Sequence, residues 1–358
     1  MNYVFFIDGS GQRIVSPAKN SSSNVCKLWN KCLDDKDKQI LFSHDGPGAV
    51  FPLMGRLIGL DSNKILIRLY QEFAQNFKLQ QRQKLAVESK RNRLSKTRIS
   101  ILESPVKIYL FGFSRGAYIA RMLAHIISVC GVPRDAKIAK SVFSSWRKGP
   151  AGMQALVNFR REKILSEPID VEYMGLWDSV RAKIRKVKNT DYYFLCKGIL
   201  ECRHAIAANE YRARFSVDRI YSEHAKEMVF PGAHSDVGGG YKHYQAIANV
   251  SLAWVANGAI RRGLLLKEQR FLSEELDLNQ AMIHNSMLDR MGAFSWRMRR
   301  RYLWGIPRHN IMQYYKEIRR ERLIRKFLDE DHENADTDNY SNKRGAVVTI
   351  MLEDQKLR

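Results

Sequence analysis

The sequence lacks a long hydrophobic run. Among its 358 residues no apolar stretch reaches the roughly 18–20 residues that a membrane-spanning helix needs, because Arg or Lys interrupts the best candidates. Residues 1–8 have no basic segment and end on a carboxylate after a few apolar residues, unlike a secretory signal. We therefore expect a protein made in the cytoplasm without signal peptide or transmembrane helix, whose contact with any membrane is peripheral.

Cysteines are few and show no pattern. Their number is odd, and neither a C-x-x-C pair nor a regular disulfide spacing is present: Cys26, Cys32, Cys130, Cys196 and Cys202. We expect reduced, partly buried thiols. The chain also contains no internal repeat and no long low-complexity tract.

Acidic residues are outnumbered, with 37 Asp and Glu against 60 Lys and Arg, for a net charge of +23. Because 45% of the residues are hydrophobic, a folded core is expected in place of disorder. The basic residues gather at 78–98, 181–188 and 296–326. Such clusters attract polyanions, either nucleic acid or anionic lipid, and charge alone does not choose between them. Each cluster is equally well explained as a solvated helix face.

Short β-prone runs alternate with segments of helical spacing. The runs lie at residues 3–7, 106–111, 171–177 and 227–230. The helical segments lie at 53–94, 117–127, 204–215 and 245–266. This alternation predicts an α/β fold with a mostly parallel central sheet flanked by helices on both faces.

The composition changes after about residue 290. Residues 296–327 are basic and aromatic and are expected to be helical, 329–342 form a polar loop, and 347–352 offer a last strand. We predict an α/β domain at 1–290, with a basic insertion at 78–98. A basic, mainly helical extension at 291–358 would pack on or next to the core.

A G-x-S-x-G pattern lies between the strand 106–111 and the helix 117–127, formed by Gly112, Ser114 and Gly116. On such a tight turn side chains at the two glycines would collide with backbone, while the serine hydroxyl is pushed out at the strand's end. This context favours a nucleophilic serine. An ordinary glycine-flanked turn or a phosphate-binding loop remains the alternative.

A serine nucleophile requires a histidine base later in the chain. His234 follows the run 227–230 in the Gly-rich loop 231–241, where Gly238 and Gly239 let the backbone approach a substrate, and it is the predicted base. His224 is a reserve, and His44 precedes the serine. Packing or surface roles are favoured for the remaining candidates: His125, His204, His243, His284 and His309.

The acid that orients the base is predicted at Asp178, which ends the strand 171–177 on the same sheet edge as Ser114. A turn-forming role at the strand end is the alternative. Asp236 is the second candidate, but it lies only two residues after His234, and we expect it to brace the glycine loop instead.

The oxyanion of an acyl-transfer reaction needs two donors. The Arg115 amide directly follows the serine, and Gly9 or Ser10 in the turn after the first strand would offer the other. Alternatively, this turn is closed by an Asx hydrogen bond from Asp8 or forms a phosphate site of another fold.

Six segments together resemble one family. They are residues 8–11, 24–28, 111–117, 175–180, 204–212 and 231–241, in order from about residue 3 to 290. This set is similar to the uncharacterised α/β-hydrolase domain shared with Type VI secretion phospholipase effectors of the first lipase family. The His-Ser-Asp-Val-Gly-Gly-Gly segment at 234–240 is far more specific than the serine turn.

The resemblance implies a catalytic domain with a triad of Ser114, Asp178 and His234 that cleaves phospholipid acyl chains as a phospholipase A. It needs no metal or cofactor. It also implies delivery into a neighbouring bacterium, with a secretion-spike protein and an immunity protein as partners. In this chain Ser10 replaces the usual Thr, and the large membrane-docking module of the best-known members is missing.

The sequence thus predicts a serine acyl-ester hydrolase that works at a phospholipid membrane surface. A nucleic-acid-binding or scaffold protein on an inactive hydrolase fold is the alternative from another class, motivated by the +23 charge. An esterase for soluble substrates is the third reading. Nucleic acid is not the expected partner.

Overall fold

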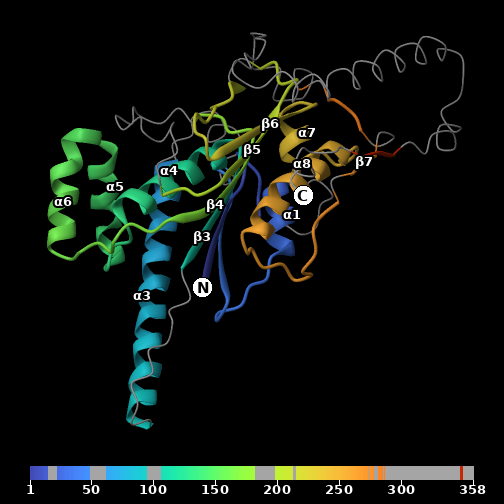
Figure 1. Ribbon diagram of the computed structural model, residues 1–358. Coiled ribbons are helices and arrows are strands. Elements are labelled where there is room, and N and C mark those ends of the chain that lie inside the picture. The colour runs from blue at the N-terminus through green and yellow to red at the C-terminus, as the bar shows by residue number, and fades with distance from the viewer. Residues whose placement is uncertain are drawn as a thin grey trace, which may run out of the picture.

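The computed structural model describes residues 1–14, 22–48, 62–94, 106–181, 198–212, 215–273, 275–277, 281–284, 286 and 347–349 (Figure 1). For 83–94, 275–277 and 347–349 the description is of the backbone alone. The helix and loop predicted at 296–342 lie outside this range, as does Cys196.

The centre of the molecule is a six-stranded sheet in the order β2-β1-β3-β4-β5-β6. Its strands are β1 (Asn2–Ile7), β2 (Gln39–His44), β3 (Lys107–Phe113), β4 (Val171–Trp177), β5 (Cys202–Ala207) and β6 (Ala225–Phe230). Every neighbouring pair runs parallel. The predicted fold class, a parallel sheet with flanking helices of the α/β-hydrolase-like kind, is confirmed.

Helices cover both faces of the sheet (Figure 1). One face packs against α3 (Ser62–Leu94), α4 (Arg115–Cys130), α5 (Ala139–Arg147) and α6 (Met153–Arg161). The other packs against α1 (Asn24–Lys31), α7 (His234–Gly238) and α8 (Ala246–Arg261). A separate antiparallel pair joins β7 (Glu275–Asp277) to β8 (Val347–Thr349).

The order of the strands reverses at β1. The chain proceeds from β1 to β2 on one side and then crosses back to β3 on the other. Loops that leave such a switch point in opposite directions open a crevice at the carboxyl edge of the sheet. Ile7 is paired in register with Gly112, so the turn after β1 and the turn after β3 begin side by side.

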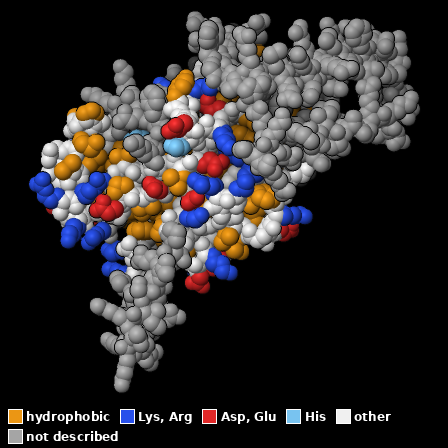
Figure 2. Space-filling model, viewed as in Figure 1, with side chains coloured by type: hydrophobic (Ala, Val, Ile, Leu, Met, Phe, Trp, Pro, Cys, Tyr) orange, Lys and Arg blue, Asp and Glu red, His pale blue; other side chains and the backbone are white. Residues whose placement is uncertain are grey.

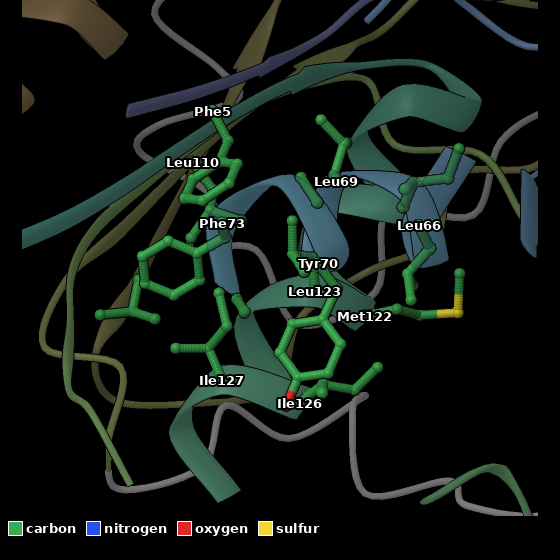
Figure 3. Packing of buried hydrophobic residues seen from close by; sticks show 14 of the residues in the cluster. Phe5, Leu66, Leu69, Tyr70, Phe73, Leu110, Met122, Leu123, Ile126 and Ile127 are labelled. Carbon is green, nitrogen blue, oxygen red and sulfur yellow. The ribbon is translucent and has the colours of Figure 1, made fainter. Parts of the chain in front are cut away.

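Aromatic rings fill the core between the sheet and α3. Phe73 of α3 meets Phe5 edge-on at 5.4 Å and Tyr3 at 5.1 Å, and Phe5 stacks on Phe42 at 4.8 Å. Figure 3 shows Phe73 and its neighbours on α3 directed toward Phe5 of β1, Leu110 of β3 and the apolar face of α4. This packing fixes α4, the helix that follows Ser114, against the sheet.

Two parts of the sequence prediction differ from the structure. The helix predicted at 204–215 is wrong, because Cys202–Ala207 is strand β5. Every residue of β5 is buried, including Arg203 and His204, and a short strand buried on both faces has no periodicity that separates it from a helix. Strand β2 was not predicted, since Gln39, Ser43 and His44 dilute its apolar residues.

The other strands and helices predicted within the described residues are present with bounds shifted by a few residues. For the helix predicted from residue 53, the structure describes α3 from Ser62 onward, and 53–61 lie outside the described residues. Helix α3 continues through the basic residues to Leu94, as the sequence predicted. The cysteines of the described part are free and buried: Cys26, Cys32, Cys130 and Cys202. Of the helices in the described ranges, none has the length and hydrophobicity to cross a bilayer.

Truncating Phe73 to Ala is expected to lower the free energy of unfolding by about 3–5 kcal/mol, because removal of a fully buried ring leaves a cavity among four other aromatic rings. The measurement is urea unfolding. Leu79→Ala on the same helix, where the side chain is 52% exposed, is the control and should cost less than about 0.5 kcal/mol. Equal losses for the two variants would contradict the packing described.

Candidate active site

Ser114 occupies a strained turn between β3 and α4. Its backbone has φ 58° and ψ −125°, a conformation that costs a non-glycine residue about 1–3 kcal/mol. A Cβ on Gly112 would lie 2.5 Å from the Cα of Ala117, and one on Gly116 would overlap the carbonyl oxygens of Ile7 and Asp8. Both glycines are therefore required for the turn to fit against its neighbours.

Asp178 and His234 are in contact, although they follow different strands. His234 begins α7 just beyond β6, and its Nδ1 lies 2.6 Å from Oδ2 of Asp178, which follows β4. The other oxygen, Oδ1, accepts a hydrogen bond of 2.9 Å from the Ala207 amide. Because the proton on Nδ1 is donated to the carboxylate, Nε2 is left as the basic nitrogen of a neutral ring.

Backbone hydrogen bonds join the serine to the aspartate. The Ser114 amide donates to the carbonyl of Trp177 at 3.0 Å, and the Val180 amide donates to the carbonyl of Ser114 at 3.3 Å. The two hydrogen bonds bind Ser114 to the residues on either side of Asp178. Like Ser114, Asp178 has a positive φ, 39°. The two strained positions therefore fix each other.

The imidazole of His234 is enclosed by aromatic rings. Phe113, the residue before Ser114, lies 4.6 Å from it between ring centroids, and Phe215 meets it edge-on at 5.0 Å. Burial lowers the pKa of His234 from its ordinary value, more strongly than the hydrogen bond that its ring donates to Asp178 raises it. The lowered pKa favours the neutral form of the His234 imidazole.

Glu210 and Arg212 belong to this site, although no role was predicted for them from the sequence. Glu210 is buried and accepts hydrogen bonds from the His234 amide at 3.3 Å and from Arg212 Nε at 2.8 Å. The guanidinium of Arg212 lies 3.7 Å from the centroid of the Phe215 ring. The only signal for them in the sequence is that both lie in 204–212, one of the six segments that carry the family resemblance. Two charged residues after a strand do not by themselves predict which groups they bind.

The predicted oxyanion donors lie in the turns after β1 and β3, which begin side by side, but one of these amides already donates within the protein. The Gly9 amide donates to its neighbour, Oδ1 of Asp8, at 2.6 Å. The Ser10 amide has no hydrogen-bond partner among the described residues. Arg115 Nε donates to the Ser10 hydroxyl, which ties this turn to the first residue of α4. The geometry therefore favours the Ser10 amide over the Gly9 amide as the second oxyanion donor, beside the amide of Arg115.

Asp236 holds the glycine-rich loop 231–241 through hydrogen bonds of its carboxylate. Its Oδ2 accepts from the Ala233 amide at 2.8 Å, and its Oδ1 lies 2.6 Å from Nδ1 of His284. His284 in turn stacks on Tyr241 with 3.8 Å between ring centroids. Asp236 thus pairs with a histidine other than His234.

The glycines that follow Asp236 let α7 approach the serine turn. A Cβ on Gly238 would overlap the ring of Phe113, and one on Gly239, where φ is 81°, would lie 2.8 Å from the Asn24 amide. The Nδ2 of Asn24 donates to the carbonyl of Val237 at 2.9 Å and so holds α7 from the other side.

The remaining histidines are separate from this pair. His125 on α4 accepts a hydrogen bond from Trp146 Nε1, His204 is buried within β5, and His224 is on the surface. His309 lies outside the described residues. Within the described ranges no group of three His, Cys, Asp or Glu side chains is arranged to hold a metal ion.

The parallel sheet with a glycine-flanked serine at its carboxyl edge defines a protein of the α/β-hydrolase-like class. A family model described as "T6SS, Phospholipase effector Tle1-like, catalytic domain" matches residues 1–258. The chain belongs to this family. No curated protein matches the chain.

Two solved structures are similar to this chain. An uncharacterized protein from Pseudomonas aeruginosa is 20% identical with a TM-score of 0.47, over 79% of this chain and 47% of that one. A Tle1 effector bound to the VgrG spike of the Type 6 secretion system is 18% identical with a TM-score of 0.37, over 68% and 51%. The chain thus spans about half the length of each.

Asp8, which closes the turn after β1, is completely buried, and burial raises its pKa to about 7. The folded protein therefore retains a proton on Asp8 that the unfolded chain releases near pH 4. It follows that stability falls as pH rises from about 4 to about 7 and then levels off.

Asp8→Asn should remove this dependence while preserving an acceptor for the Gly9 amide. The free energy of unfolding of the variant, measured between about pH 5 and 8, should therefore gain on the parent protein as pH rises. Asp37→Asn, at an exposed carboxylate before β2, is the matched control and should leave the slope unchanged. Parallel curves for Asp8→Asn and the parent would show that Asp8 is ionised in the folded state.

Proposed function

We propose that this protein is a serine hydrolase that cleaves the acyl esters of phospholipids, a phospholipase of the A type, through Ser114, His234 and Asp178. The observation that carries the proposal is the buried 2.6 Å contact between His234 and Asp178 at the sheet edge where Ser114 follows β3. Membership in the Tle1-like phospholipase effector family supports lipid as the substrate class.

In the proposed reaction the hydroxyl of Ser114 attacks the ester carbonyl carbon and passes its proton to Nε2 of His234. The negative oxygen of the tetrahedral intermediate accepts hydrogen bonds from the amides of Arg115 and Ser10. When the intermediate collapses, the departing lysolipid oxygen takes the proton from His234. Water then attacks the acyl-serine with the same base, which releases the fatty acid and restores Ser114.

Asp178 supports these reaction steps because its carboxylate accepts a hydrogen bond from Nδ1 of His234 and stabilises the imidazolium that forms transiently. Burial makes the pairing necessary, since a charged ring in this apolar enclosure would otherwise be strongly disfavoured. Each oxyanion donor would be worth about 10²–10³ in kcat.

We further propose that the substrate is reached at an anionic membrane surface. On the face shown in Figure 2, the end of the molecule formed by α5 and α6 carries Lys and Arg beside hydrophobic side chains. Exposed there are Met153 and Val157 together with the following basic residues: Lys140, Lys148, Arg160, Arg161 and Lys163. Each basic residue near an anionic surface contributes about 1 kcal/mol.

The family relation also supports the wider context of a secreted effector. We propose delivery by a type VI system, a spike protein as the carrier, and an immunity protein in the producing cell. The nucleic-acid alternative has no specific observation in its favour, because the basic residues at 182–188 and 296–326 lie outside the described range.

Ser114→Ala is expected to reduce fatty-acid release from vesicles of phosphatidylglycerol and phosphatidylethanolamine by at least about 10³-fold, since the nucleophile is lost. The variant should also fail to react with a fluorophosphonate probe, while its binding to the vesicles in a flotation assay stays unchanged. Ser179→Ala, at the buried serine next to the predicted acid, is the control and should still be labelled by the probe.

Fatty-acid release that survives Ser114→Ala would contradict the mechanism. The choice between membrane and soluble substrates is a separate outcome: one short-chain phospholipid is compared below and above its aggregation concentration. A rate that ignores the interface would identify a soluble-ester esterase that uses the same serine.

The acid limb of the pH–rate profile is expected below the ordinary histidine value of about 6.5. His234 must be neutral to accept the serine proton, and its burial lowers the pKa at which it becomes charged. The measurement is kcat/KM for a monomeric ester from about pH 5 to 9. Activity that halves at or above about pH 6.5 would show that another group, or an exposed histidine, serves as the base.

A further inference from the structure

His204 occupies the middle of β5, beside the turn Asp178–Ser179–Val180 that carries the proposed acid. We call these three residues the acid turn. The imidazole is completely buried, and both of its nitrogens are engaged. Nε2 accepts a hydrogen bond of 3.0 Å from the Ser179 amide, and Nδ1 donates to Oε1 of Glu227 at 2.9 Å.

These partners determine the tautomer of His204. The Ser179 amide can only donate, so Nε2 must present its lone pair, and the single ring proton is on Nδ1. Glu227 accepts a hydrogen bond from this N–H group. Its carboxylate also accepts hydrogen bonds from Arg219 Nε and from the Ile220 amide, the latter at 3.0 Å. The carboxylate thus fixes the imidazole in the one state that can bind the acid turn.

The carbonyl side of the acid turn is held by residue 218, which directly precedes Arg219 and Ile220 in the chain. The Asp218 amide donates to the Ser179 carbonyl at 2.7 Å, and Arg121 NH1 donates to the carbonyl of Asp218 at 2.8 Å and to its carboxylate at 3.0 Å. Arg121 belongs to α4, the helix that follows Ser114. Asp218 and its neighbour Arg219 therefore connect the helix of the nucleophile with the support of the acid.

The acid turn needs such support. Asp178 has a φ of 39°, which a non-glycine residue retains only when its surroundings over-determine it. Its carboxylate must also stay within hydrogen-bond distance of the His234 ring, which is anchored on another strand. A small rotation of this backbone would move the carboxylate away from Nδ1.

We propose that His204, with its tautomer fixed by Glu227, is a positioning residue of the hydrolase, and that its hydrogen bond to the Ser179 amide holds the acid turn in the conformation that presents Asp178 to His234. The inference rests on the function proposed above and deepens it. His204 takes no part in proton transfer, because both nitrogens are occupied and no ring atom reaches the surface.

The test compares His204→Leu with His204→Gln in the full chain. Leu removes the acceptor, and kcat is expected to fall about tenfold to a hundredfold with KM nearly unchanged, because a misplacement on the order of 1 Å has that effect. The carbonyl oxygen of Gln reaches the position of Nε2, so His204→Gln should restore kcat to within a few-fold of the parent.

A spectroscopic measurement separates positioning from general destabilisation. The proton shared by His234 and Asp178 should give a far-downfield NMR resonance, which His204→Leu shifts or broadens. His125→Leu is the matched control, because this histidine is also buried and accepts a hydrogen bond from Trp146. It should lower the thermal stability while leaving kcat and the resonance unchanged.

If His204→Leu does not fold, His204→Asn replaces it, since its shorter amide cannot reach Ser179 while remaining as polar as Gln. Parent-like kcat in a folded Leu or Asn variant, or an equal loss in His204→Gln, would overturn the inference. Ser114→Ala is measured alongside. Hydrolysis that survives Ser114→Ala would instead refute the proposed mechanism, so the two failures are distinguishable.

Discussion

The contact between His234 and Asp178 is the constraint on which the site depends. It joins a helix that follows β6 to a turn that follows β4, and it is buried on all sides. An unpaired charge at this depth would be costly, so neither partner tolerates displacement. The hydrogen bonds around it, from Ala207 to the carboxylate and from His234 to Glu210, serve to hold the two groups at one distance.

Much of this arrangement could be predicted from the sequence, for a physical reason. In a parallel sheet the carboxyl ends of all strands meet at one edge, so Ser114, Asp178 and His234 were expected there once each was seen to follow a β-prone run. The glycines at 112 and 116 predicted the serine turn because only residues without a side chain fit between Ala117 and the end of β1.

The sequence could not predict which side chains and backbone groups of the site bind one another. The sequence placed Asp236 near His234 but could not show that it binds His284, nor that the Gly9 amide is taken up by Asp8. His204 was assigned to a helix because a fully buried strand has no alternation to read. Contacts such as His204 with Glu227 depend on which strands become neighbours, and single-residue patterns carry no information about that.

Among the described strands, β6 lies at an outer edge of the sheet and is paired on one side only, with β5. Since His234 lies just beyond its end, detachment of this one strand would separate His234 from Asp178 while the other five strands stayed hydrogen-bonded. The proposed hydrolase activity therefore requires β6 to be docked at the margin of the sheet, so the integrity of one outer strand decides whether the candidate site is complete.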